Sequence, residues 1–172
     1  SVETIVMFSG LKKDENIDID NLNDSIKNLY KTDYFKKVQI KTINNKIIII
    51  VEENPIIQSI SISGIKNKDL LRQLIKVTKK SEKYPYLKNK IKEQRDLLTN
   101  IVRANGFYFS EIETNLANNK NNSVDIYYDF ILGERAIIKT INFKGDKKFK
   151  ESKLRNIIKS EEGKIWKFIT SN

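Results

Sequence analysis

The sequence predicts an α+β protein made of tandem units of the order β-α-α-β-β, each a three-stranded mixed sheet with two helices on one face. Three observations support this class. A strand-hinge-strand segment over residues 47–64 recurs over residues 124–145, and a repeat of this length indicates small domains. Apolar residues at helical spacing and strand-like runs follow one another in the same order in both copies. Capping and turn residues separate these runs.

The repeat keeps a constant offset of 81 residues around the hinge, without a gap. Its matched positions are Glu53, Ile57, Ile60, Ile62 and Gly64 in one copy, and Glu134, Ile138, Ile141, Phe143 and Gly145 in the other. Pro55 cannot donate to a sheet ladder, so it marks a break between units. We therefore expect a first unit over residues 1–54 that lacks its first strand, a complete second unit over residues 55–134, and the first strand and first helix of a third unit over residues 135–172.

The first unit is expected to hold two helices and a hairpin. Ser1 is expected to cap a helix over residues 2–8 that ends at Gly10, and Asp20 to cap a second helix. The apolar stripe of that second helix is formed by Leu22, Ile26, Leu29 and Tyr30. Strands over residues 36–42 and 46–51 flank Asn44-Asn45, a dipeptide that favours a hairpin turn.

The second unit supplies every element of the order. A strand over residues 56–63 precedes a helix that Asn67 caps, and a longer helix runs from Leu87 to Val102 and ends at Asn105-Gly106. Strands over residues 111–116 and 124–131 follow, with an asparagine-rich loop over residues 118–122 between them. In the third unit we expect a strand over residues 137–144 and a helix that carries Leu154, Ile157 and Ile158.

The order of elements also predicts the sheet topology. A hairpin pairs the second and third strands, and a right-handed crossover places the first strand parallel to the third. The second strand of each unit is then a free edge beside the second helix, where an extended segment can be added. The candidate peptide-binding residues are Val38, Ile40 and Thr42 in the first unit, and Ile112, Thr114 and Leu116 in the second. An ordinary solvated edge, protected by Lys37, Lys41 and Glu111, is the alternative.

The composition argues against an enzyme or a metalloprotein. The chain has no Cys and no His, which removes the commonest nucleophile-base pairs and metal ligands. The adjacent pairs Glu52-Glu53 and Glu161-Glu162 would point to opposite faces of a strand. We therefore assign no catalytic residue, no metal ligand and no cofactor. Glu53 and Glu134 are expected instead to fix the angle between units through hydrogen bonds or ion pairs.

The formal net charge is +10, from 32 Lys and Arg against 22 Asp and Glu. Such a surplus favours anionic partners, but the lysines are interpreted as spread along the chain by compositional bias, without an arginine cluster or a basic stripe. A basic α/β module that binds nucleic acid is kept as an alternative. No apolar run approaches the ~18 residues of a membrane helix. The first residues also lack the pattern of a signal peptide, so an exported chain would be an internal part of a longer precursor.

These units resemble the POTRA (polypeptide-transport-associated) domains of the bacterial outer-membrane protein assembly family. The resemblance rests on the β-α-α-β-β order, the E-x-x-x-I-x-x-I-x-[IF]-x-G hinge, and the L-Y-x-x-x-Y-F-x-x-V run from Leu29 to Val38. The segment from Asn156 to Phe168, with Trp166, is similar to the third such domain of the family. Asp33 departs from the pattern because the second unit has Gly106 at the matching position.

The resemblance implies a non-enzymatic scaffold in the periplasm, the soluble part of an outer-membrane protein whose C-terminal barrel is absent here. The implied partners are unfolded outer-membrane β-barrel proteins and accessory assembly lipoproteins, bound by strand augmentation, and not nucleic acid. The joints between units would be formed by Glu53, Pro55, Glu134 and Arg135. An arm of a secretion or division protein is the alternative within the same domain class.

A further expectation concerns the open edge of the first unit at residues 47–51, where its own first strand would lie. We predict that this edge is filled by another chain, through strand-exchange contacts, or by crystal contacts.

Overall fold

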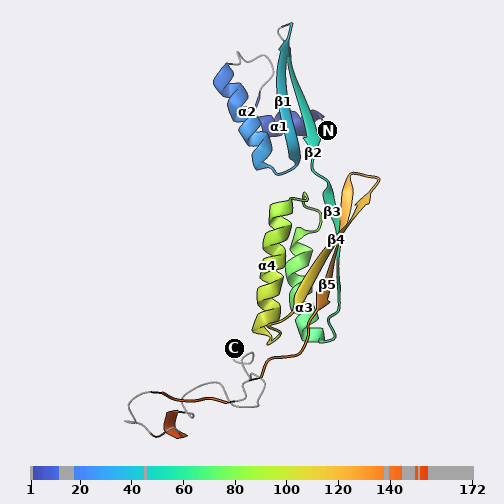
Figure 1. Ribbon diagram of the computed structural model, residues 1–172. Helices are drawn as coiled ribbons and strands as arrows, with labels where there is room; N and C mark the ends of the chain where they lie inside the picture. The colour runs from blue at the N-terminus through green and yellow to red at the C-terminus, as the bar shows by residue number, and fades with distance from the viewer. Residues whose placement is uncertain are drawn as a thin grey trace.

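The structure, a computed structural model, describes residues 2–11, 18–44, 46–137, 140–144, 150 and 152–154 of the 172-residue chain. Two units, each made of helices packed on a sheet and called the first layer and the second layer below, follow one another along the chain (Figure 1). The first consists of helices α1 (Val2–Ser9) and α2 (Ile19–Lys31) and strands β1 (Phe35–Ile43) and β2 (Lys46–Glu53). The second consists of β3 (Ile56–Ser63), α3 (Lys68–Thr78), the short 3-10 turn η1 (Lys79–Ser81), α4 (Lys88–Ala104), β4 (Glu111–Asn119) and β5 (Ser123–Ile131).

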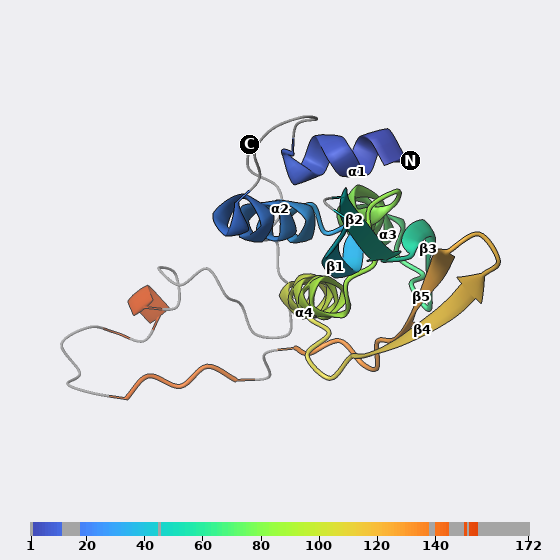
Figure 2. The same cartoon turned by 90° about the horizontal axis from the view of Figure 1, so that it is seen from above.

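In the first layer, β1 and β2 form an antiparallel hairpin, as predicted. Helices α1 and α2 lie on one side of it, which the view from above shows (Figure 2). Leu29, Phe35 and Val38 form its buried core. The cap of α2 differs from the prediction, because Asp18 and not Asp20 occupies that position. The Asn21 N–H donates to Asp18 Oδ1 at 2.8 Å, and the Asp18 N–H donates to Asn21 Oδ1 at 3.1 Å, which forms a reciprocal capping box.

The second layer has the predicted topology. Its strand order is β3-β5-β4, with β5 parallel to β3 and antiparallel to β4. Helices α3 and α4 lie together on one face of this sheet (Figure 1). Strand β4 continues to Asn119, so the connecting loop is shorter than the asparagine-rich run predicted. The Asn119 side chain explains the extension, since its Nδ2 donates to Asp125 Oδ2 of β5 at 2.8 Å.

The core of the second layer contains a polar chain. Tyr128 is fully buried, and its hydroxyl donates to Gln94 Oε1 at 2.8 Å, while Gln94 Nε2 donates to Ser81 Oγ at 2.7 Å. Burial raises the pKa of the Tyr128 hydroxyl. These bonds satisfy groups whose burial would otherwise be costly, and they tie α4 to the central strand.

Gly64 shows why the repeat ends in glycine. Its φ is +81°, and a Cβ built there would lie 1.9 Å from the carbonyl oxygen of Phe130. The left-handed backbone and the close approach of β5 both require glycine. The chain can therefore pass close to the backbone of β5 as it leaves β3.

The described part of the third unit differs from the prediction. Residues 137 and 140–144 are described and are not in a strand, which contradicts the prediction of a strand over 137–144. A strand needs a hydrogen-bonding neighbour, and no named strand of the described chain pairs with this segment. Residues 152–154, including Leu154, are helical. Ser1, Ile138, Gly145, Ile157 and Ile158 lie outside the described residues.

Candidate functional site

The candidate site is the free edge of β4. This strand pairs with β5 from Glu111 to Asn119, and no other strand among the described residues pairs with its opposite side. The backbone N–H and C=O groups on that side therefore have no ladder partner. Such an edge is a template for an incoming extended chain.

A groove of about 730 Å³ runs between this edge and the first half of α4. Its apolar side chains include Ile91, which is buried, and Leu116, which is 45% exposed. The complete lining is Tyr86, Lys88, Asn89, Ile91, Lys92, Arg95, Thr114 and Leu116. The groove thus offers apolar surface for a side chain and cations around it.

The predicted residues of β4 divide between core and groove. Ile112 packs against the buried core of the second layer. Thr114 and Leu116 line the groove. The Thr114 hydroxyl is buried and has no hydrogen-bond partner within the described part of the chain.

The predicted residues of β1 are placed less favourably for binding. Val38 is buried in the core, Ile40 is half-buried and Thr42 is exposed. The Val38 N–H donates to the Tyr30 hydroxyl at 3.0 Å, so this donor is already engaged by α2. Sequence reasoning placed Tyr30 on an apolar stripe and missed this role. The structure therefore distinguishes two edges that the sequence treated alike.

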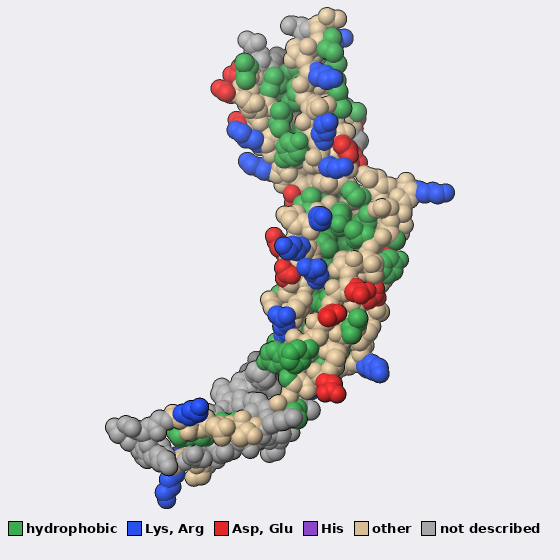
Figure 3. Space-filling model, viewed as in Figure 1, with side chains coloured by type: hydrophobic (Ala, Val, Ile, Leu, Met, Phe, Trp, Pro, Cys, Tyr) green, Lys and Arg blue, Asp and Glu red, His purple; other side chains and the backbone are tan. Residues whose placement is uncertain are grey.

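Basic residues concentrate in the helical layer of the second unit. Residues 64–110 contain 12 Lys and Arg and 4 Asp and Glu, whereas strands β3, β4 and β5 contain no Lys or Arg. The basic residues are Lys66, Lys68, Arg72, Lys76, Lys79, Lys80, Lys83, Lys88, Lys90, Lys92, Arg95 and Arg103. Figure 3 shows most basic side chains of this unit over α4, with some acidic side chains beside them, and further acidic side chains over the strand side. Within the second unit the basic residues therefore lie on the helical side and not on the strands.

The outer face of the sheet has the opposite character. Asp125 accepts from Ser59 Oγ at 2.5 Å and Asn119 Nδ2 at 2.8 Å, and Asp129 accepts from Ser63 Oγ at 2.5 Å. The bonds from Ser59 and Asn119 hold the pKa of Asp125 below its usual value. On β4 the exposed Glu111 and Glu113 add to this acidic face.

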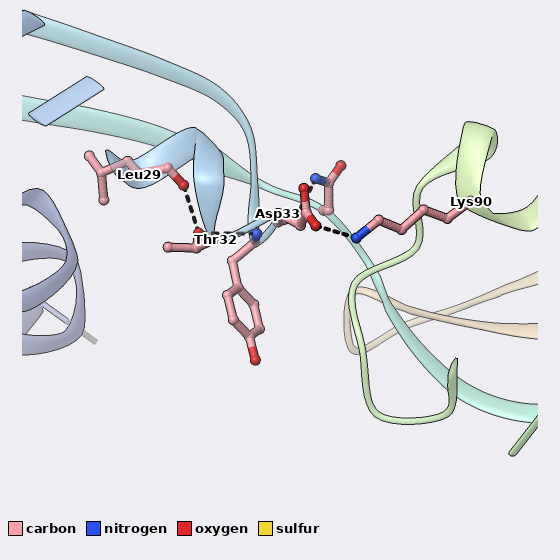
Figure 4. Close-up of polar contacts among 6 residues, drawn as sticks. Leu29, Thr32, Asp33 and Lys90 are labelled. Atoms are coloured by element: carbon pink, nitrogen blue, oxygen red, sulfur yellow. Dashed lines mark hydrogen bonds and ion pairs between the residues drawn. The ribbon is translucent and has the colours of Figure 1, made fainter. Parts of the chain in front are cut away.

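The joint between the two layers is built differently from the prediction. Within the described chain, the side chains of Glu53 and Glu134 are exposed and form no hydrogen bond or ion pair. Instead Lys90 Nζ lies 2.5 Å from Asp33 Oδ2, and Asn54 Nδ2 donates to the Asp33 carbonyl at 2.8 Å (Figure 4). Asp33 has a φ of +63°. The sequence signal for this conformation is Gly106, which stands at the matching position of the second unit, because glycine adopts the left-handed backbone readily.

The other predicted joint residues make local contacts. The Pro55 carbonyl accepts from the Tyr86 N–H at 2.7 Å. After β5, Arg135 Nε donates to the Asn105 carbonyl at 2.9 Å, and the guanidinium lies 5.9 Å from the centre of the Phe107 ring. Gly106, with a φ of +92°, leaves the space that the Arg135 side chain occupies. Arg135 thus fastens the segment after β5 to the end of α4.

Among the described residues, no helix combines the length and apolar character needed to cross a bilayer. The same residues contain no group of three or more acidic side chains, His or Cys placed to hold a metal ion.

Comparison with known proteins finds relatives of the second layer. The family model of the POTRA domain, described as a surface antigen variable number repeat, matches residues 55–131. The outer membrane protein assembly factor BamA of Neisseria meningitidis serogroup B is 26% identical over 151 residues, which cover 84% of this chain and 18% of that protein. The chain therefore spans less than a fifth of that relative's length. Neither description names an enzymatic activity.

Solved structures of the same class are also similar. POTRA domains 3–5 of Haemophilus influenzae BamA give a TM-score of 0.48 at 15% identity, covering 96% of this chain and 74% of that one. The N-terminal domain of Omp85 from Thermosynechococcus elongatus gives a TM-score of 0.46 at 8% identity, covering 95% and 72%. The family match rests on the sequence model. Over residues 55–131 this chain is therefore similar to the POTRA family.

Proposed function

We propose that this chain is part of the periplasmic scaffold of an outer-membrane β-barrel assembly protein. It binds unfolded barrel proteins and accessory assembly lipoproteins, and it has no enzymatic role. The POTRA match and the similarity to an outer membrane protein assembly factor support the class. The single observation that supports the mechanism is the unpaired β4 edge beside the α4 groove.

Strand augmentation explains how such a site accepts many sequences. Main-chain hydrogen bonds to β4 supply affinity that does not depend on the side chains of the client. The groove then receives only alternate side chains, because successive residues of a strand point to opposite faces. A barrel protein before assembly is a chain of extended, strand-forming segments, so it suits this edge.

The test is an NMR titration of the 172-residue chain with a peptide from an outer-membrane barrel strand. We expect shifts confined to β4 and to residues 91–102 of α4. A scrambled peptide controls for composition, and a peptide N-methylated at alternate residues controls for main-chain hydrogen bonds because it keeps every side chain. Binding by the N-methylated peptide as tight as by the parent would contradict augmentation.

The density of basic residues over 64–110 favours one second candidate, a module that binds nucleic acid. Electrostatic binding of this kind weakens steeply with salt. Fluorescence anisotropy with labelled single- and double-stranded oligonucleotides at low and at physiological salt would reveal it. No binding at low salt would eliminate this candidate. A POTRA-type arm of a secretion or division protein is distinguished by the domain that follows this chain in the full protein.

A further inference from the structure

The cations of the α4 groove are open to an incoming side chain. Lys88 and Lys92 are exposed and have no ion pair among the residues that the structure describes. Arg95 has one acidic neighbour, with Asp96 Oδ1 3.8 Å from its guanidinium nitrogen. All three line the groove beside Thr114 and Leu116. The groove therefore presents positive charge that the described chain leaves largely uncompensated.

The opposite face of the same edge is negative. Glu111 and Glu113 alternate with Ile112 and Thr114 along β4, so they project to the outer face of the sheet. Both are exposed, and the neighbouring strand β5 adds Asp129, which lies opposite Glu113 in the register. With no Lys or Arg in β3, β4 or β5, nothing basic on these strands offsets the acidic face.

From these two faces we infer that the β4 edge selects extended segments whose side chains alternate in charge. Acidic side chains of the segment face the α4 groove beside Lys88, Lys92 and Arg95, and basic side chains face outward beside Glu111 and Glu113. This inference rests on the proposed function, since it requires that a strand is added to β4. It goes further because it names the class of segment that binds tightest.

The alternation also sets the register of the added strand. A shift by one residue moves every side chain to the other face. It would then bring acidic side chains beside Glu111 and Glu113 and basic side chains beside the three groove cations. Electrostatic repulsion therefore disfavours half of the registers that backbone pairing alone allows.

The experiment compares three peptides of equal length and strand propensity on the full 172-residue chain. In the first, Glu and Lys occupy adjacent positions, so that all Glu side chains lie on one face of the strand and all Lys side chains on the other. The second carries Gln at each of these positions and the third carries Lys at each of them, and β-branched residues fill the remaining positions in all three. We expect the alternating peptide to bind about fivefold tighter than the Gln peptide, which corresponds to two or three exposed ion pairs. The advantage should shrink as salt is raised.

Two triple variants locate the effect. Lys88→Gln, Lys92→Gln and Arg95→Gln together should remove the advantage of the alternating peptide over the Gln peptide. The matched control, Lys66→Gln, Lys68→Gln and Lys76→Gln, removes the same charge from outside the groove lining and should keep the advantage. An equal loss in both variants would assign the effect to the overall field of the helical layer and overturn the inference.

The remaining outcomes separate the inference from the proposed function. Equal affinity for the alternating and Gln peptides, with shifts along β4, would overturn the charge selection and leave augmentation intact. No binding by any peptide at millimolar concentration would overturn the proposed function and the inference together.

Discussion

At the scale of single residues, the structure contains polar groups whose environment is unfavourable. The hydroxyls of Ser110 and Thr114 are buried and have no partner within the described chain. An unpaired buried hydroxyl costs roughly 1–3 kcal/mol. Thr114 is of greater interest because it lines the groove of the candidate site.

Thr114→Val replaces this hydroxyl with a methyl group of similar size and keeps a β-branched strand residue. We expect the free energy of unfolding to rise by about 1 kcal/mol, measured by urea denaturation. Thr99→Val is the control, because the Thr99 hydroxyl already donates to the Arg95 carbonyl at 2.9 Å. A loss of stability in Thr114→Val would show that its hydroxyl is bonded in solution.

Asp33 is a second residue in an unfavourable environment. Its left-handed backbone is unfavourable for a side chain other than glycine, and its carboxylate meets Lys90 from the next layer. Both groups are partly exposed, so the ion pair contributes only about 0.2–1 kcal/mol. Its effect is therefore on the orientation of the layers more than on global stability.

Lys90→Gln should loosen the first layer relative to the second without lowering the melting temperature measurably. Nitrogen-15 relaxation would report it as faster, more independent tumbling of residues 18–44, and high salt should reproduce the effect in the unaltered chain. Lys76→Gln, on the neighbouring helix, is the control. Identical relaxation in the Lys90 and Lys76 variants would mean that Asp33 and Lys90 do not restrain the joint.

At the scale of elements, two polar networks tie helices and strands together. The chain of Tyr128, Gln94 and Ser81 crosses the core between β5, α4 and the turn after α3. On the outer face, Ser59, Asp125 and Asn119 bridge all three strands. The first network is buried, so it matters for stability, whereas the second is half-buried and contains a titratable carboxylate, that of Asp125.

Gln94→Leu should destabilise the chain by about 1–3 kcal/mol, because it leaves the buried Tyr128 hydroxyl without its acceptor. Adding Tyr128→Phe should recover part of this loss, since replacing both partners with apolar groups removes the unpaired hydroxyl. Urea denaturation of the two variants tests this. A double variant less stable than the single one would show that Tyr128 has another partner.

Asp125 gives the outer network a pH dependence. Its pKa is lower in the folded chain than in the unfolded chain, through bonds from Ser59 and Asn119. The stability that Asp125 contributes to the folded state is therefore fully present above its unfolded pKa of about 4. It is lost as pH falls through the folded pKa. The urea midpoint of Asp125→Asn should accordingly fall less between pH 7 and pH 2.5 than that of the unaltered chain. An equal fall in both would contradict this assignment.

At the scale of the whole molecule, the open edge of the first layer stands out. Strand β2 pairs only with β1 among the described strands, and Ile48 and Ile50 are 40% and 43% exposed. Unpaired backbone beside exposed apolar side chains favours association between edges. The expectation that another chain fills this edge remains a prediction.

We expect the chain to self-associate at high concentration through residues 47–51. Sedimentation velocity over a concentration series would show the association, and Ile48→Lys with Ile50→Lys should reduce it by placing charge on the edge. Leu97→Lys, an exposed apolar residue of α4, is the matched control. A monomer at the highest concentration reached would contradict the prediction.

The sequence by itself determined the second unit almost completely. The strand-hinge-strand repeat, the Asn67 cap and the Asn105-Gly106 stop are local signals, and with the right-handed crossover they leave one topology in which β4 is the edge. The prediction of a strand over 137–144 failed for its described residues because alternation shows that a segment can form a strand, but not that a neighbour is in place.

Only the tertiary structure decided which edge is open and what surrounds it. Tyr30 occupies the Val38 donor, and Lys90 meets Asp33 across 57 residues of sequence. The groove brings cations of α4 beside Thr114 and Leu116 of a later strand. Hydrophobic periodicity assigns a residue to a face of its own element. It does not say which side chain of another element lies opposite, because that depends on how the packed layers are oriented.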